Sequence, residues 1–139
     1  MIENDADSRE VAKAIIITKN NKVLILQRSA YVKKYADEWD LPGGHLKETE
    51  LVEIGLDREV REETGLNISN LDHEKLMTVD NMHYYIIKYN KNNDEIDVNI
   101  SDEHVDHAFI SREELDNFNI SDKFISAINK SMGFDDESS

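Results

Sequence analysis

The 139 residues are the length of one domain, enough to bury a single hydrophobic core but not two. A formal net charge of −14 argues against a surface that follows nucleic-acid phosphates, and the absence of cysteine leaves only oxygen or imidazole to hold a metal. The N-terminal stretch is acidic and has no apolar run, so it does not resemble a signal peptide. No segment approaches the ~20 apolar residues of a membrane span. We therefore expect a cytoplasmic protein without a membrane segment. We expect one domain over residues 1–139, with disordered tails at 1–8 and 135–139.

Two runs of β-branched and aliphatic residues open the folded part, at residues 11–18 and 22–28. Asn20 and Asn21 lie between them, and asparagine tolerates left-handed backbone, so the pattern predicts a β-hairpin. Residues 29–41 show no periodicity and are expected to be irregular.

A turn and a helix are predicted next. Residues 41–44 contain the only proline of the chain and two of its five glycines, a composition typical of a turn. Residues 49–64 then follow a helical pattern, and Gly65 is expected to close the helix.

Strands dominate the pattern that follows. Runs at residues 74–79 and 82–89 predict two strands, and a short run at 105–110 predicts another. Residues 96–100 alternate apolar and polar side chains, which predicts a half-buried strand there as well.

Two helices are expected near the C-terminus. Ser111 and Glu114 have the spacing of a capping box that opens a short helix. Ser121 is expected to cap a last helix, with Gly133 past its end. The apolar face of that helix would carry Phe124, Ile125, Ile128 and Met132.

The most informative segment, residues 44–66, reads GHLKETELVEIGLDREVREETGL. It resembles the Nudix box, G-x5-E-x7-R-E-U-x-E-E-x-G-U with U aliphatic, and all nine specified positions match. From average residue usage, a given window would match by chance roughly once in 10^9. The pattern is therefore strong for the family. It does not name the substrate, because the box handles the metal and the diphosphate that all these substrates share.

On a helix, Glu59, Glu62 and Glu63 are spaced i, i+3, i+4, so their carboxylates share one face. Val52 and Leu56 point nearly the same way, so a core-facing stripe continues as carboxylate. Like charges at this spacing repel by a few tenths of a kcal/mol in solvent and more when partly buried. A divalent cation removes that repulsion, and Mg2+, or Mn2+, suits such oxygen donors. The alternative is a solvated acidic helix face.

The resemblance also implies roles around these carboxylates. A loop carbonyl at Gly43 or Gly44 would join Glu59, Glu62 and Glu63 as a metal ligand. Arg58 would pair with Glu50 and with box carboxylates, and so orient the metal ligands.

Two flanking segments extend the resemblance, which covers roughly residues 10–132. Residues 39–44 look like the usual lead-in to the box. Residues 101–104 look like the downstream segment where many members place another acidic residue, and this role falls to Glu103. Asp102 and Glu74 are competing candidates for it. Glu103 or a box carboxylate such as Glu62 would act as general base.

Three residues are candidates for substrate contacts. Lys33 lies in the loop before the box and could meet phosphates, although a solvated lysine pair with Lys34 is the competing interpretation. Lys47 replaces the glutamate that many members have after the loop glycines, and it adds positive charge near the expected diphosphate. Tyr84 lies in a predicted strand, where it would stack on a nucleobase or pack in the core.

The resemblance implies an α/β fold, the α/β/α Nudix sandwich with a mixed β-sheet between helices. It also implies an Mg2+-dependent pyrophosphohydrolase that cleaves a diphosphate linkage in a small nucleotide derivative. One alternative is a catalytically silent Nudix domain that senses nucleotides, although such domains usually lose box carboxylates. A Nudix-fold isomerase is disfavoured because it requires a catalytic cysteine. The pattern leaves the oligomeric state open, a homodimer included.

Overall fold

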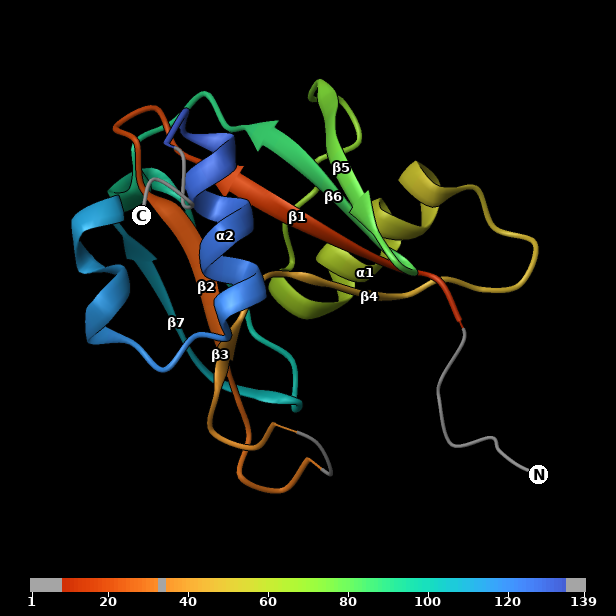
Figure 1. Cartoon of the computed structure of the whole chain (residues 1–139), viewed down its shortest axis with the longest axis horizontal. Helices are drawn as coiled ribbons and strands as arrows, with labels where there is room; N and C mark the ends of the chain where they lie inside the picture. The colour runs from red at the N-terminus through yellow and green to blue at the C-terminus, as the bar shows by residue number, and fades with distance from the viewer. Residues whose placement is uncertain (1–8, 33–34, 135–139) are drawn as a thin grey trace.

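The computed structural model describes residues 9–32 and 35–134, which form a mixed sheet between two α-helices (Figure 1). The strands are β1 (Val11–Ile17), β2 (Val23–Arg28), β3 (Trp39–Asp40), β4 (Gly43–His45), β5 (His73–Val79), β6 (Met82–Lys88) and β7 (His104–Ile110). The helices are α1 (Val52–Thr64), α2 (Asp122–Ser131) and the 3-10 turns η1 (Asn93–Glu95) and η2 (Arg112–Asn117). The predicted α/β/α fold with a mixed sheet is thereby confirmed, while the expected tails lie outside the described residues.

Strand β1 occupies the centre of the sheet, whose order is β3-β2-β1-β6-β5. One edge of β1 pairs in parallel with β6 along its whole length. The other edge is shared, because β2 pairs with β1 at Ile17 and Val23, beside the hairpin turn, and β4 pairs with the first residues of β1. The predicted hairpin is therefore confirmed, and its two strands leave room for the glycine segment, residues 41–44, to enter the sheet beside Lys13.

Alternation along the strands builds one hydrophobic core on each face of the sheet. On one face, residues such as Ala14 and Ile16 of β1 pack under Leu56 and Val60 of α1. On the other face, residues such as Ile15 pack with Phe124, Ala127 and Ile128 of α2. The predicted apolar face of the last helix is thus a core face. The two cores fix α1 and α2 on opposite sides of the same sheet.

The helix of the box begins at Val52, three residues later than predicted, and ends at Gly65 as expected. The reason for the late start is local. Glu50 donates its backbone N–H to the carbonyl of Lys47 in a turn, and its carboxylate is used by Arg58. The turn predicted at residues 41–44 is also shorter than expected, because Gly43 and Gly44 belong to β4.

The strand predicted at residues 96–100 is wrong. Ile96 follows the 3-10 turn η1, and the next four residues are irregular. The N–H of Asn99 donates to the carbonyl of Thr64 and that of Ser101 to the carbonyl of Glu63, at 2.8 and 3.3 Å. The alternation reflects a real half-buried segment, since Ile96 is buried. Its backbone satisfies the carbonyl end of α1 and not a neighbouring strand.

The C-terminal elements match the pattern that predicted them. Ser111 and Glu114 form a capping box, and it opens η2. Ser121 lies at the N-cap of α2, but its side chain makes no capping hydrogen bond; its carbonyl accepts from Phe124 and Ile125 instead. Within residues 9–32 and 35–134, no helix has the length and apolar character needed to cross a membrane.

Candidate functional site

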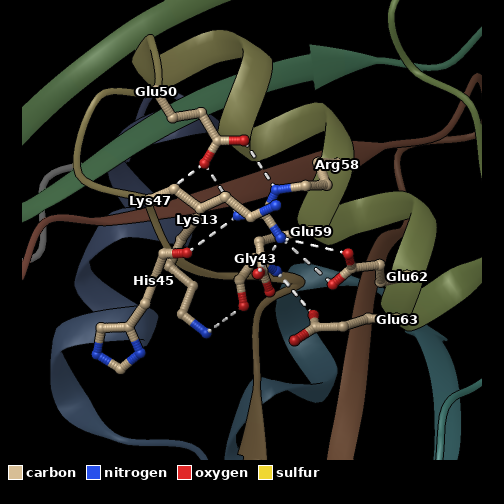
Figure 2. A network of polar contacts seen from close by, with 9 residues as sticks. All are labelled: Lys13, Gly43, His45, Lys47, Glu50, Arg58, Glu59, Glu62 and Glu63. Atoms are coloured by element: carbon tan, nitrogen blue, oxygen red, sulfur yellow. Dashed lines mark hydrogen bonds and ion pairs between the residues drawn. The ribbon is translucent and has the colours of Figure 1, made fainter.

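Helix α1 directs a buried carboxylate at the glycine segment. Glu63 continues the core-facing stripe of Val52 and Leu56, as predicted, and only 8% of it is exposed. Its Oε1 accepts the backbone N–H of Gly43 at 2.9 Å (Figure 2). The core packing of the helix therefore fixes where this carboxylate meets the loop.

Both glycines of the segment are required by close approaches. Gly43 has φ of +128°, and a Cβ there would lie 2.0 Å from the carbonyl oxygen of Ala12. At Gly44, a Cβ would lie 2.3 Å from Oε1 of Glu59. The backbone thus comes against two carboxylates of one helix, Glu59 at Gly44 and Glu63 at Gly43.

Arg58 joins the carboxylates to one another. Its Nε and Nη2 bond both oxygens of Glu50, at 2.8 and 3.0 Å, a bidentate pairing. Its Nη1 lies 2.8 Å from Glu59 and 3.3 Å from Glu62, and Nη2 also donates to the carbonyl of His45 at 3.2 Å. Figure 2 shows the guanidinium at the centre of this network. The predicted pairing of Arg58 with Glu50 is therefore present.

Glu50 gives this network a pH dependence. Hydrogen bonds from Arg58 and from the N–H of Lys47 lower the pKa of Glu50 from 4.5 to about 2. A carboxyl with a lowered folded-state pKa stabilises the fold above its unfolded pKa, and that stability is lost as the pH falls through about 2. We expect Glu50→Gln to unfold at a lower temperature than wild type at pH 7. The difference should shrink between pH 4.5 and 2 in thermal melts, and a difference that does not change with pH would contradict this assignment.

Sequence reasoning missed a buried charge cluster behind the glycine segment. Lys13 of β1 donates from Nζ to the carbonyls of Leu41 and Gly43, at 3.1 and 3.2 Å, and lies 3.7 Å from Oδ2 of Asp40. Arg28 lies 3.3 Å from the same oxygen, and Nε2 of His104 lies 3.4 Å from the other oxygen of Asp40. The sequence feature that could have indicated this cluster is Lys13, a single charged residue inside the apolar run of residues 11–18.

The electrostatics of this cluster reach the α1 carboxylates. Burial raises the pKa of Glu63 to about 7, although Lys13 and the N–H of Gly43 act in the opposite direction. Burial also acts to raise the pKa of Asp40, but Lys13, His104 and Arg28 outweigh it and hold that pKa below its usual value. A carboxyl that is buried and not fully compensated is a favourable place for an added cation.

The donor chemistry around the glycine segment fits a hard divalent cation. Glu59 and Glu63 approach adjacent glycines with carboxylate oxygens, which Mg2+ prefers. Within residues 9–32 and 35–134, no three acidic, histidine or cysteine side chains converge as a finished metal site. The guanidinium of Arg58 contacts two of the candidate carboxylates, those of Glu59 and Glu62. A cation would have to share those carboxylates with Arg58.

Glu103 lies on an exposed turn just before β7. Its carbonyl accepts the N–H of Ser29 at 2.8 Å, and its N–H donates to Oγ of Ser101 at 3.4 Å. Ser101 in turn bonds the carbonyl of Glu63. The downstream acidic segment is therefore attached to the C-terminal end of α1, the end that carries the metal-ligand candidates.

The three predicted substrate contacts have different fates. Lys33 lies outside the described residues. Lys47 is exposed, and its backbone N–H donates to Glu50 at 2.9 Å. Tyr84 is 2% exposed and belongs to the core under α2, where its ring lies 6.5 Å from that of Phe124.

Tyr84 also borders a cavity of about 240 Å³, called here the α2 cavity. Its other lining residues are Met77, Val79, Asp80, Asn81, Met82, Lys123 and Ser126.

Known proteins share both the sequence pattern and the fold. Over 54 residues the chain is 48% identical to the 8-oxo-dGTP diphosphatase of Buchnera aphidicola subsp. Schizaphis graminum, covering 38% of this chain and 40% of that protein. The structure of a MutT protein from Methanosarcina mazei Go1 superposes with a TM-score of 0.72 at 23% identity, over 94% of this chain and 99% of that one. An Ap4A hydrolase from C. elegans superposes with a TM-score of 0.70 at 22% identity, over 88% and 96%.

The fraction of each similar protein that is aligned, and the sequence identity, determine what these matches establish. The sequence alignments cover between 20% and 57% of the curated relatives, so they do not carry over a whole protein's activity. The structural matches, at these identities, establish the fold. The profile of the NUDIX domain, however, matches residues 8–128, most of the chain. The chain therefore belongs to the NUDIX domain family.

Proposed function

We propose that this protein is a metal-dependent pyrophosphohydrolase that cleaves the diphosphate linkage of a small nucleotide derivative. One observation carries the proposal: a single helix places Glu59 and Glu63 against adjacent glycines, with Glu63 bonded to Gly43 at 2.9 Å. Membership of the NUDIX family supports it. The intact set of box carboxylates favours a working enzyme over a nucleotide-sensing domain.

In this proposal, Glu59, Glu62 and Glu63 hold the cation together with a carbonyl of Gly43 or Gly44. A bound Mg2+ or Mn2+ would neutralise charge on the diphosphate and make an attacking water more acidic. The positions of the ligands are determined by contacts within the chain. The core packing of α1 aims Glu63 at the loop, and the close approach at Gly44 restricts Glu59.

Arg58 and Glu50 are positioning residues in this scheme. Arg58 divides its donors between Glu50 and the carboxylates of Glu59 and Glu62. The bidentate bond to Glu50 fixes the plane of the guanidinium, and so fixes the oxygens that it contacts. Without that bond the same arginine could cover a carboxylate that the cation needs.

Two exposed carboxylates can act as general base. The side chain of Glu62 is 59% exposed, and Glu103 lies on the turn attached to the end of α1. An exposed carboxylate can take a proton from water and pass it to solvent. Water attacks phosphorus, the P–O bond to the leaving phosphate breaks, and the displaced proton leaves through one of these two residues.

The α2 cavity supports the proposal that the substrate contains a nucleoside. It offers an aromatic wall at Tyr84 and polar groups at Asn81, Lys123 and Ser126. Such a mixture of apolar surface and a few polar groups is typical of small-molecule sites. The similar proteins named for 8-oxo-dGTP and Ap4A point to the same substrate class. We also propose that the protein acts in the cytoplasm, where such nucleotides are made and used.

A substrate panel tests the proposal. The purified protein is assayed with Mg2+ and with Mn2+ on ADP-ribose, dinucleoside polyphosphates, oxidised nucleoside triphosphates, nucleotide sugars and capped RNA. We expect one class to reach a kcat/KM of about 10^4 M⁻¹s⁻¹ or more, with the others well below. Glu63→Gln protein purified in the same way is the control for contaminating phosphatases. Binding of these compounds without turnover would replace the proposal by the nucleotide-sensing alternative.

A further inference from the structure

Lys13 is a buried ammonium in the central strand. Its side chain is 9% exposed, and its neighbours in β1 are alanine, valine and isoleucine. Taking an ammonium group out of water is costly unless a carboxylate compensates it. A lysine at the centre of the sheet, beside the candidate site, therefore needs a specific explanation.

The partners of Lys13 compensate its charge only in part. Nζ donates to two neutral carbonyls, those of Leu41 and Gly43, and its nearest carboxylate is Asp40 at 3.7 Å. Asp40 is itself 3.3 Å from Arg28, so two cations share one carboxylate. Glu63 approaches from the α1 side, where its Oε1 is engaged by the N–H of Gly43 at 2.9 Å. An anionic acceptor in place of one of the neutral carbonyls would therefore stabilise the ammonium further.

The position of Lys13 joins the glycine segment to the α2 cavity. In Figure 2 its ammonium reaches the carbonyl of Gly43, the residue whose N–H donates to Glu63. Its partner in the parallel register with β6 is Tyr84, which lines the cavity. The ring of Phe124 lies 5.6 Å from Nζ on the same face of the sheet. Lys13 thus lies between the place proposed for the diphosphate and the place proposed for the nucleoside.

We propose that Lys13 is a substrate-binding residue, whose ammonium exchanges the Gly43 carbonyl for a phosphate oxygen of a nucleotide with its nucleoside in the α2 cavity. The inference rests on the proposed function and assigns a further residue to it. The exchange needs only rotation of the flexible lysine stem. It replaces a neutral acceptor by an anionic one, and charge-assisted hydrogen bonds are the stronger kind. No covalent bond is made or broken in this step.

Equilibrium binding of product-like probes tests the inference without turnover. Wild type and Lys13→Met are titrated calorimetrically, in metal-free buffer, with dGMP and AMP and with the nucleosides deoxyguanosine and adenosine. Lys88→Met, at an exposed position of the neighbouring strand β6, is the matched control. We expect Lys13→Met to weaken the tighter monophosphate by about 10- to 100-fold, the range for a hydrogen bond to a charged group, and to leave the nucleoside unchanged.

A second variant separates phosphate binding from loop support. Lys13→Gln keeps N–H donors for the carbonyls of Leu41 and Gly43 but removes the charge. A residue that only supports the loop would be rescued by glutamine, whereas a phosphate-binding residue would not. Equal affinity of wild type and both variants for dGMP and AMP overturns the inference, as does full rescue by Lys13→Gln or failure of wild type to bind either monophosphate.

These outcomes are distinguishable from failure of the proposed function. If a substrate in the panel is turned over but Lys13→Met binds the monophosphates normally, only the inference on Lys13 fails. If the monophosphates depend on Lys13 but no compound in the panel is cleaved, only the hydrolase proposal fails.

Discussion

Glu63→Gln is expected to reduce kcat by about 10^3-fold or more, because losing one charged ligand removes several kcal/mol of charge stabilisation. Glutamine has nearly the same size, and its carbonyl oxygen can still accept the N–H of Gly43. The core packing of α1 around Leu56 and Val60 is unchanged. The variant should therefore lose its activity while it keeps its fold. Activity is measured as initial rates at saturating substrate, and folding by circular dichroism and thermal melting.

Glu53→Gln is the matched control, since it makes the same chemical change in the first turn of the same helix, away from the glycine segment. It should keep near-wild-type turnover. Glu62→Gln should also abolish turnover, because Glu62 is proposed both as a metal ligand and as a candidate base. Near-wild-type activity of Glu63→Gln on the best substrate would sink the assignment of the α1 carboxylates.

The sequence predicted the box helix well because its pattern has a physical cause. The stripe of Val52 and Leu56 must face the core, and the spacing of Glu63 places it on the same side. The bond between Arg58 and Glu50, which holds at 2.8 Å, was predicted by the resemblance to the Nudix box and not by periodicity. Along α1, periodicity determines which side of the helix a residue faces.

Contacts between distant segments were not predictable in this way. Lys13 and Gly43 meet because β4 replaces β2 along the edge of β1, a pairing that no local pattern indicates. Residues 96–100 showed the alternation of a strand, yet the N–H of Asn99 donates to the end of α1 and not to a neighbouring strand. Periodicity therefore predicted which side chains are buried, while the partner of each backbone group depended on the tertiary fold.

Removal of metal is the second change with a very large expected effect. Three carboxylates lie on one helix beside Arg58, those of Glu59, Glu62 and Glu63. In the proposed scheme they also bind the cation. Arg58 compensates two of these carboxylates, and the cation would neutralise the diphosphate charge during attack. Chelation should therefore stop hydrolysis without unfolding the protein, since both cores are built from apolar side chains.

The most direct test of a metal-dependent hydrolase is the rate of cleavage of the best substrate in one sample, before EDTA, after EDTA, and after Mg2+ is added in excess. The rate is followed by chromatographic separation of the nucleotide products. We expect cleavage to fall to the uncatalysed rate with EDTA and to return when Mg2+ is restored. Hydrolysis that continues at the wild-type rate in metal-free buffer would contradict the proposed role of the α1 carboxylates.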